Sequence, residues 1–344
     1  MLGSVSTADG TWCRSLDKAD RLAGALLGEA LGDALGFVVE AQPPEVAQSY
    51  VDEWLRRGRA GQRSSPHYPF GQYSDDTQLA RELLLSFRER RLWDPEDYAH
   101  RLAQLFGQAR DVGAGSGTRS AALRIHQGLH WSRAGTPAPY AGNGSAIRAG
   151  PLGLLFSDIA TIARVAREQS RITHLDPRCG AGAVAIALGV SIAVREGPVD
   201  PRQFLHEIAA AVEQDDMAFA QALRSCAEWT SLSPAEAARQ LHQTNLDPTY
   251  PKWQGVSAFV VPSVIWSLYS FLRSPDDYWE TVCTAITVGG DTDSTAAMAG
   301  AMSGARGGST GLPQGLLGRL TDRGEWGAGE LTLLARDCAG MPWG

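Results

Sequence analysis

Two aspartates open an unusual stretch of the chain, VGGDTDSTAAMAGAMSGA at positions 288–305. Asp291 and Asp293 precede a run of small apolar residues, and no lysine or arginine follows them until Arg306. Carboxylates this close repel each other and lose hydration when buried, unless a positive charge joins them. The pattern therefore predicts a bound cation at the start of this segment.

A second acidic cluster lies in YSDDTQ, where Ser74, Asp75, Asp76 and Thr77 come directly before an apolar helical pattern. Helix capping is one interpretation, but a cap needs only one such residue. Carboxylate and hydroxyl oxygens suit Mg²⁺ or Mn²⁺ rather than zinc, because neither histidine nor cysteine accompanies them. Together with Ser294, the two clusters supply enough oxygens to hold two octahedral cations.

The residues beside Asp291 indicate how its cluster is presented. Gly289 and Gly290 permit an unusual backbone before it. If the segment is extended, the side chains of Asp291 and Asp293 point the same way. Ser294 then begins the helix.

Apolar residues recur at the helical period along most of the chain, whereas alternating strand patterns are absent. Polar loops rich in glycine and proline separate these segments, and none has the character of an interdomain linker. The sequence therefore predicts a single all-α domain. The expected helices span residues 17–36, 77–91, 95–109, 117–130, 157–169, 179–196, 201–214, 217–229, 234–243, 258–272, 276–287 and 294–305.

The first of these helices carries glycine at every fourth position: Gly24, Gly28, Gly32 and Gly36. Each glycine costs about 0.8–1 kcal/mol relative to alanine inside a helix, so the close approach of a neighbouring backbone must compensate. The helix predicted at 294–305 has a similar face of small residues. We expect the two helices to touch.

Composition excludes several classes of protein. A net charge of −7 and a pI near 5.5 leave no basic field for nucleic acid. Five scattered cysteines without a CxxC pair argue against a disulfide framework and favour the cytoplasm. No signal peptide is evident, and the most apolar stretches, 22–39 and 179–194, contain the polar or glycine residues of core helices. We therefore expect neither secretion nor a membrane span.

Together the motifs resemble the ADP-ribosylglycohydrolases, which include the dinitrogenase-reductase-activating glycohydrolase and the ADP-ribosylarginine hydrolases. The resemblance covers nearly the whole chain and implies a single compact domain at 17–344, packed orthogonally around a binuclear Mg²⁺ or Mn²⁺ centre. An extension at 1–16 precedes it. The matching segments, in family order, are GALLGEALGDALGFVVE, YSDDTQ, GAGSGT, GNGSAIRAGPLG, THLDP and GGDTDSTAAMAGAMSGA.

The resemblance also implies roles for individual residues. One cation would be held by Ser74, Asp75, Asp76 and Asp293, and the other by Asp291, Asp293 and Ser294, with Asp293 bridging. The candidate catalytic residues are Glu40, Asp76, Asp111 and Asp293. The candidate ADP-ribose contacts are Gly113, Gly115, Ser116, Gly117, Asn143, Gly144, Ser145 and His174.

Several of these assignments have structural alternatives. Glu40 matches a position near the scissile bond in related hydrolases, but it also fits a surface helix end. Asp111 could orient the guanidinium of an arginine substrate or serve as a turn carboxylate. A histidine such as His174 is often a satisfied core residue. Trp253 lies near a loop where an aromatic ring could stack on adenine.

The implied function is hydrolysis of the bond between ADP-ribose and a modified protein side chain, with arginine expected as the linkage. Linkages to serine, nucleobases or small molecules are alternatives. An immunity protein whose N-terminal extension blocks an ADP-ribosylating toxin is a further possibility, since that extension is polar and carries Trp12. A purely structural relative is disfavoured, because it has no need of both acidic clusters.

Overall fold

The computed structural model describes residues 16–249 and 251–341, and within them the chain is helical, with only isolated β-bridges and no strand. The predicted all-α class is confirmed. Residues 1–15, most of the predicted extension, lie outside the described part. The elements are α1 (Lys18–Gly36), η1 (Phe37–Val39), α2 (Pro44–Tyr50), η2 (Val51–Leu55), η3 (Ala60–Gln62), α3 (Asp75–Arg90), α4 (Pro95–Gly107), α5 (Ser116–His126), α6 (Trp131–Ala134), α7 (Leu152–Leu155), α8 (Ile159–Arg171), α9 (Pro177–Ala193), α10 (Pro201–Val212), α11 (Met217–Trp229), α12 (Pro234–Gln243), α13 (Val260–Arg273), α14 (Tyr278–Ile286), α15 (Thr292–Gly307), η4 (Ser309–Gly311), α16 (Gln314–Leu317) and α17 (Ala328–Ala339).

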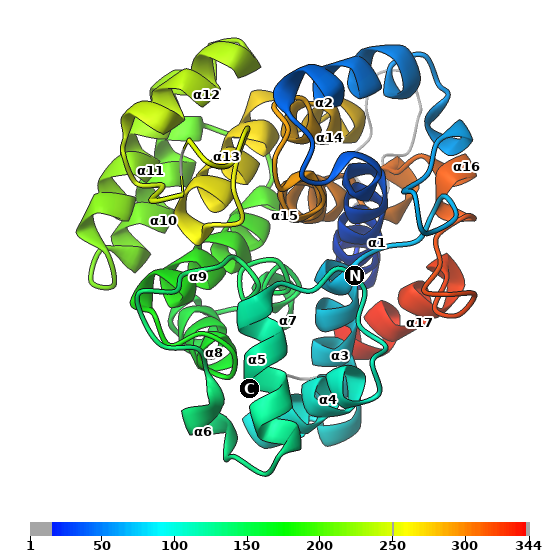
Figure 1. The fold of residues 1–344 in the computed structure, drawn as a ribbon, viewed down its shortest axis with the longest axis vertical. Helices are drawn as coiled ribbons and strands as arrows, with labels where there is room; N and C mark the ends of the chain where they lie inside the picture. The colour runs from blue at the N-terminus through cyan, green and yellow to red at the C-terminus, as the bar shows by residue number, and fades with distance from the viewer. Residues whose placement is uncertain (1–15, 250, 342–344) are drawn as a thin grey trace, which may run out of the picture.

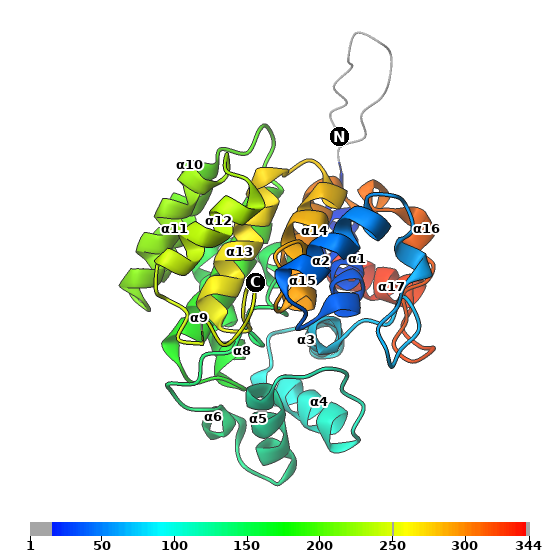
Figure 2. The same cartoon turned by 45° about the horizontal axis from the view of Figure 1, so that its top comes forward.

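Helices from distant parts of the chain surround a central pair. In both ribbon views α10, α11, α12 and α13 lie together on the left and α16 lies on the right, with α15, α14, α2 and α1 between them (Figures 1 and 2). The segment containing α4, α5 and α6 lies at the bottom of both views. The pair α1 and α15 is therefore part of the central group of helices.

The two central helices touch through their glycine stripes, as expected. A Cβ added at Gly28 would lie 2.4 Å from the Gly300 carbonyl oxygen, and one at Gly32 would lie 2.2 Å from that of Ala296. The contact is reciprocal, since a Cβ at Gly304 would lie 2.1 Å from the Gly24 oxygen. Only residues without side chains allow this backbone approach, which explains why the glycine spacing is retained despite its cost.

The apolar character of α1 follows from this position. With η1 it forms 22 residues that are long and apolar enough to cross a membrane by length and composition, yet 94% of its most apolar window is buried inside the fold. The Tyr278 hydroxyl donates to the Gly28 carbonyl across this packing at 2.8 Å. Burial among other helices thus accounts for the composition of α1.

Two helix starts differ from the prediction in a way that affects the site. Helix α3 begins at Asp75 and α15 at Thr292, each two residues earlier than expected. Asp293 therefore lies in a first helical turn rather than in an extended segment. The expectation of an extended backbone there was wrong, because the four free N–H groups of a helix start favour acidic residues within the first turn.

One buried acid on α1 stands apart from the acidic clusters. Glu29 is fully buried, and neither carboxylate oxygen has a hydrogen-bond partner within the described residues. Burial raises its pKa well above 4.5, and the Asp33 carboxylate raises it further. The folded protein therefore favours the protonated form of Glu29 more strongly than the unfolded chain does.

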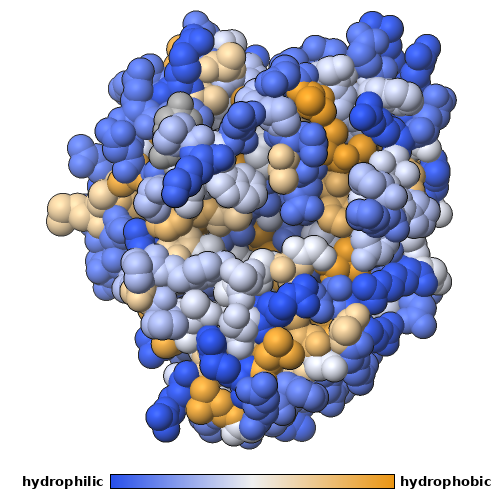
Figure 3. Space-filling model, viewed as in Figure 1, coloured by the Kyte–Doolittle hydropathy of each residue, from blue (hydrophilic) through white to orange (hydrophobic). Residues whose placement is uncertain are grey.

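The outer surface is predominantly polar. On the face drawn in Figure 3, hydrophilic residues predominate and hydrophobic ones form small separate groups. Large exposed apolar side chains, among them Leu92, Met217 and Leu333, come from helices or turns far apart in the chain. Scattered apolar residues of this kind are ordinary on a protein surface.

We predict that Gly32→Ala destabilises the protein by about 1–3 kcal/mol, because the new methyl group meets the Ala296 backbone and forces α1 and α15 apart. Chemical denaturation measures the change in the free energy of unfolding. Gly329→Ala is the matched control, since Gly329 is exposed in α17 with open space around its Cβ position. It should be neutral or stabilise by up to about 1 kcal/mol. Equal effects of the two substitutions would contradict the packing account.

We also predict that Glu29→Gln stabilises the protein in a pH-dependent manner. The folded state keeps a proton on Glu29 that the unfolded chain releases above pH 4.5, so wild-type stability falls as the pH rises from 4.5 toward the raised pKa. Glu29→Gln has no carboxyl group to titrate at this position, so its stability does not fall for this reason. Unfolding measured at pH 4.5 and pH 8 should therefore show a larger advantage for Glu29→Gln at pH 8, and an advantage independent of pH would contradict the assignment.

Candidate functional site

The two acidic clusters and Glu40 meet in one cavity. Asp75 and Asp76 lie in the first turn of α3, Asp291 is the residue directly before α15, and Asp293 lies in the first turn of α15. All of them line the cavity together with Glu40, which follows η1. Carboxylate oxygens of Glu40, Asp291 and Asp293 lie within 4.8 Å of one another. The structure thus brings together groups that are more than 200 positions apart in the sequence.

The start of α3 is fixed by a carboxylate from α1. Asp33 is fully buried and accepts hydrogen bonds from the Ser74 backbone N–H at 2.8 Å, the Thr77 N–H at 3.1 Å and the Thr77 hydroxyl at 2.6 Å. The Ser74 hydroxyl caps the helix by accepting from the Asp76 N–H at 3.2 Å. Burial raises the pKa of Asp33 to about 6, although the hydrogen bonds from Thr77 and Ser74 oppose the shift.

Sequence reasoning missed the role of Asp33. Its signal was an acid in GEALGDALG, a segment that otherwise contains only Glu29, glycine, alanine and leucine. Such a residue needs a partner when the helix is buried. The partner, however, is a backbone more than 40 positions away, which periodicity cannot reveal.

The start of α15 is fixed by neighbouring backbone. Gly289 and Gly290 have φ of +70° and +87°, as the glycine pair suggested. A Cβ at Gly290 would lie 2.1 Å from the Val256 carbonyl oxygen, which also accepts from the Asp291 N–H at 2.7 Å. The Asn143 amide donates to Asp291 Oδ2 at 2.6 Å. Asn143, a predicted ADP-ribose contact, therefore orients a predicted metal ligand.

The carboxylates in this cavity have no basic partner. Burial raises the pKa values of Asp75, Asp76 and Asp293 well above the usual range, and neighbouring carboxylates raise them further. None of the ion pairs formed by the described residues includes these side chains. Moreover, Asp76 Oδ2 is buried without a hydrogen-bond partner in the described chain. Oxygen donors of this number, charge and burial fit hard divalent cations.

Glu40 is positioned to act beside this cluster. Its carboxyl group is half-buried and lines the same cavity. Burial raises its pKa to about 7, and the carboxylates of Asp291 and Asp33 add to the shift. Glu40 directly follows η1, at a helix end as the alternative expected, but its side chain lines the cavity.

The glycine loop forms another wall. Gly113 and Gly115 line the cavity, and the loop is tied to α3 by the Asp75 N–H, which donates to the Val112 carbonyl at 2.6 Å. The Gly117 N–H donates to the Tyr140 hydroxyl at 3.1 Å, and the Ser116 hydroxyl lies 3.4 Å from the same oxygen. Two of the candidate ADP-ribose contacts, Ser116 and Gly117, are therefore engaged by Tyr140 in this structure.

The segment around Asn143 is divided between cavity and core. Gly144 and His174 line the cavity. Ser145 does not: its hydroxyl is fully buried, donates to the Cys179 carbonyl at 3.2 Å and accepts from Ser170 at 2.9 Å. The Ser145 side chain thus faces the core, contrary to its expected role as an ADP-ribose contact.

Asp111 also differs from expectation. It is 8% exposed, is not among the residues that line the cavity, and forms an ion pair with Arg119 of the same chain. The Arg119 guanidinium makes a 3.2 Å hydrogen bond to Asp111 Oδ1 and also lies over the Phe106 ring. The carboxylate predicted to bind a substrate guanidinium is therefore already paired with an internal one.

Other cavity residues were missed or left open by the sequence. Thr118, Tyr140 and Trp253 line the cavity. The Tyr140 ring stacks on His174 with centroids 5.8 Å apart. Trp253 is thus correctly placed for the stacking role considered above, whereas no pattern in the sequence marked Tyr140, which lies in an irregular loop.

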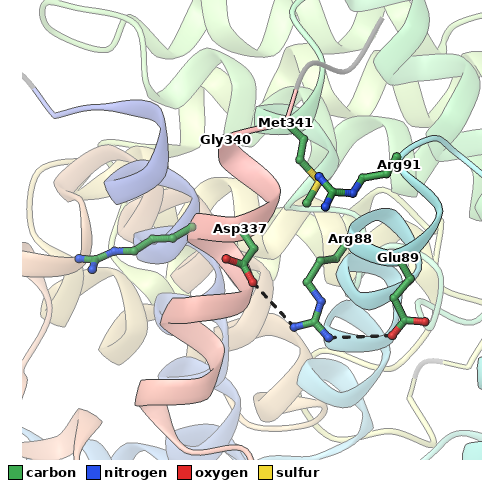
Figure 4. A pocket seen from close by; sticks show the side chains of 7 residues that line it. Arg88, Glu89, Arg91, Asp337, Gly340 and Met341 are labelled. Atoms are coloured by element: carbon green, nitrogen blue, oxygen red, sulfur yellow. Dashed lines mark ion pairs between the residues drawn. The ribbon is translucent and has the colours of Figure 1, made fainter.

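A second surface hollow lies at the opposite end of α3, where it meets the end of α17 (Figure 4). One of its arginines lies beside acids: Arg88 is 3.9 Å from Glu89 and 3.9 Å from Asp337. None of the predicted site residues lines it. The acidic cavity is therefore the candidate functional site.

The fold and the acidic cavity agree with a comparison to known families. The sequence profile of the ADP-ribosylglycohydrolase family matches residues 14–342, and the chain therefore belongs to this family. The expected membership and fold type are confirmed.

Individual relatives agree with this assignment. The chain is 29% identical over 309 residues to the ADP-ribosylhydrolase ARH3 of Bos taurus, covering 81% of this chain and 82% of that protein. It is 29% identical over 308 residues to the ADP-ribosyl-[dinitrogen reductase] glycohydrolase of Rhodospirillum rubrum, covering 88% and 90%. A solved structure described as an ADP-ribosylglycohydrolase-related protein complex superposes with a TM-score of 0.70 at 26% identity, covering 94% and 98% of the two chains.

We predict that divalent cations bind in the cavity and relieve the repulsion between its carboxylates. In EDTA, Asp76→Asn should raise the Tm by at least about 2 °C, because it removes a buried carboxylate without a partner. Mn²⁺ at 100 times its dissociation constant should stabilise the wild type by about 2.7 kcal/mol, and the variant much less.

Thermal unfolding with and without Mn²⁺ makes this measurement. Asp337→Asn is the matched control, since Asp337 is an exposed aspartate in the second hollow. It should keep the full response to Mn²⁺. An Asp76→Asn variant that keeps the wild-type response would show that Asp76 holds no cation.

Proposed function

We propose that the chain is a metal-dependent hydrolase that cleaves the N-glycosidic bond between ADP-ribose and a modified arginine side chain. The observation that carries this proposal is the cavity in which two helix starts and Glu40 place buried carboxylates without a basic partner. Membership of the ADP-ribosylglycohydrolase family supports the reaction class. The expected partner is an ADP-ribosylated protein.

The residues that would hold the cations are those of the two helix starts. Ser74, Asp75, Asp76 and Asp293 would bind one, and Asp291, Asp293 and Ser294 the other, with Mg²⁺ or Mn²⁺ as the metal. Divalent cations bound there would supply positive charge for vicinal ribose hydroxyls and lower the pKa of a bound water. Asp33 and Asn143 keep these ligands oriented, as partners of metal ligands commonly do.

The other residues of the cavity indicate how the ADP-ribosyl group of a substrate would be bound. Glu40 lies on the acidic side of the cavity, where its carboxyl can exchange a proton with a water attacking the glycosidic carbon. The glycine loop and Gly144 leave room for the diphosphate, because neither carries a side chain into the cavity. Trp253 and Tyr140 offer aromatic faces for the base. The ADP-ribosyl group is thus held between an acidic end and an aromatic rim.

A second candidate is hydrolysis of another ADP-ribose linkage, such as that to serine. The pairing of Asp111 with Arg119 favours it, because a substrate arginine would have to displace an internal guanidinium from this carboxylate. An uncharged attachment site requires no such exchange. Both candidates use the same acidic cavity and differ only in the leaving group.

We predict that the enzyme releases ADP-ribose from an ADP-ribosylarginine peptide in the presence of Mg²⁺ or Mn²⁺, and that EDTA abolishes the release. Asp293→Ala should lower the rate to below about one-hundredth, since Asp293 is the shared ligand. Chromatographic quantification of free ADP-ribose measures both effects. Asp276→Ala, an exposed aspartate paired with Arg306, is the matched control and should keep the wild-type rate.

An ADP-ribosylserine peptide, assayed in parallel, separates the two candidates. Release from serine alone would replace the arginine proposal by the second candidate. If neither peptide is hydrolysed with either metal, the proposed function is wrong.

A further inference from the structure

A buried arginine lies directly behind the cavity wall. Arg148 is fully buried, and no carboxylate forms an ion pair with it within the described residues. Its guanidinium donates instead to neutral acceptors: Gln169 Oε1 at 2.6 Å, the Gly144 carbonyl at 3.0 Å, and the Gln169 carbonyl and Thr173 hydroxyl at 2.9 Å each. Removing a guanidinium from water costs free energy, so the burial of Arg148 without a paired carboxylate indicates a specific role.

The contact from Arg148 to Thr173 decides where the threonine proton points. A guanidinium has only donors, so the Thr173 oxygen must accept from it. The single hydroxyl proton of Thr173 is then free for its other neighbour, His174 Nδ1, at 2.8 Å. If Nδ1 were protonated, the Thr173 oxygen would accept from both neighbours, and its own proton would have no acceptor among the described residues; the arrangement therefore favours Thr173 as the donor and Nδ1 as the acceptor.

An Nδ1 that accepts a hydrogen bond carries no proton, so a neutral imidazole places its proton on Nε2. The ring is neutral, since burial and the nearby Arg148 lower the pKa of His174 to about 3. Nε2 makes no hydrogen bond within the described residues. It lies on the cavity side, 3.4 Å from the position of a Cβ at Gly142, with the Tyr140 ring stacked on the imidazole.

We propose that Arg148 and Thr173 are positioning residues that hold His174 in its Nε2–H form, so that the cavity presents a fixed hydrogen-bond donor to an acceptor oxygen of the ADP-ribosyl group. The ligand in this statement rests on the proposed function, whereas the tautomer does not. The donor is neutral, so it contributes no charge beside the acidic cluster. It selects for an oxygen acceptor, from either a phosphate or a ribose hydroxyl.

The tautomer is tested by nitrogen NMR of protein labelled in histidine, with His174→Asn used to assign the signals. In the wild type between pH 5 and 8, His174 should show an unprotonated Nδ1 and a protonated Nε2. Thr173→Ser retains the hydroxyl and should give the same spectrum. Thr173→Val keeps the shape but removes the donor, and should populate the Nδ1–H form. A wild-type spectrum with a protonated Nδ1 overturns the proposal, even if Thr173→Val fails to fold.

Binding of ADP-ribose, measured by calorimetry in the presence of Mg²⁺, tests the consequence. Thr173→Val should weaken binding roughly 3- to 10-fold, as expected for one hydrogen bond, while Thr173→Ser should bind like the wild type. Binding of ADP distinguishes the two acceptors. If His174 contacts a phosphate, Thr173→Val should weaken the binding of ADP and ADP-ribose alike. If His174 contacts the distal ribose, Thr173→Val should weaken the binding of ADP-ribose alone.

The two proposals fail in different ways. If the wild type has the Nε2–H tautomer but binds no ADP-ribose, the proposed function and the ligand assignment are wrong while the tautomer stands. If ADP-ribose binds equally to the wild type and to a folded Thr173→Val, the positioning role is wrong while the proposed function stands.

Discussion

The candidate site depends on how buried carboxylates are held close together, since none of them pairs with a basic side chain among the described residues. Asp75, Asp76, Asp291 and Asp293 are each at most 6% exposed, and burial raises the pKa of every one of them. The starts of α3 and α15 offset part of this charge, but a helix start contributes only about half a unit charge. Divalent cations bound among these carboxylates would relieve the remaining repulsion.

Such a site must be held together by rigid parts of the fold. The backbone contact between α1 and α15 fixes the distance between two helices that carry acidic residues at or near their ends. Asp33 then ties α3 to α1, and the Val256 carbonyl ties Asp291 to the loop before α13. The acids are thus placed by rigid helices and by backbone hydrogen bonds rather than by flexible loops, which is the arrangement a preorganised metal site requires.

Hydrogen bonds orient residues on more than one side of the cavity. Arg148 and Thr173, which do not line the cavity, act on His174, whereas Asn143, which does line it, acts on Asp291. The acidic wall therefore suits cations and hydroxyls, and the wall that contains His174 presents a neutral donor. The two walls together fit a ligand with a diol at one end and oxygen acceptors along its length.

Several features of the fold and of the site could be predicted from the sequence, and there are physical reasons why the others could not. The glycine spacing in α1 required a close partner, and the small-residue face of α15 identified it. Neighbouring acids marked both helix starts, because local repulsion is visible in the sequence. The side chains of Asp33, Ser145 and Arg119 could not be placed this way, since each is satisfied by a group on another element. Tyr140 was missed because an irregular loop has no period.

The central claim is that the acidic cavity binds divalent cations. Diffraction from crystals soaked in Mn²⁺, recorded at the manganese absorption edge, locates bound metal without reference to activity. Anomalous density is expected in the cavity between Asp76 and Asp293, and it should be lost from Asp293→Ala crystals. Density only at other sites, or none in a cavity that remains open to solvent, would contradict the account.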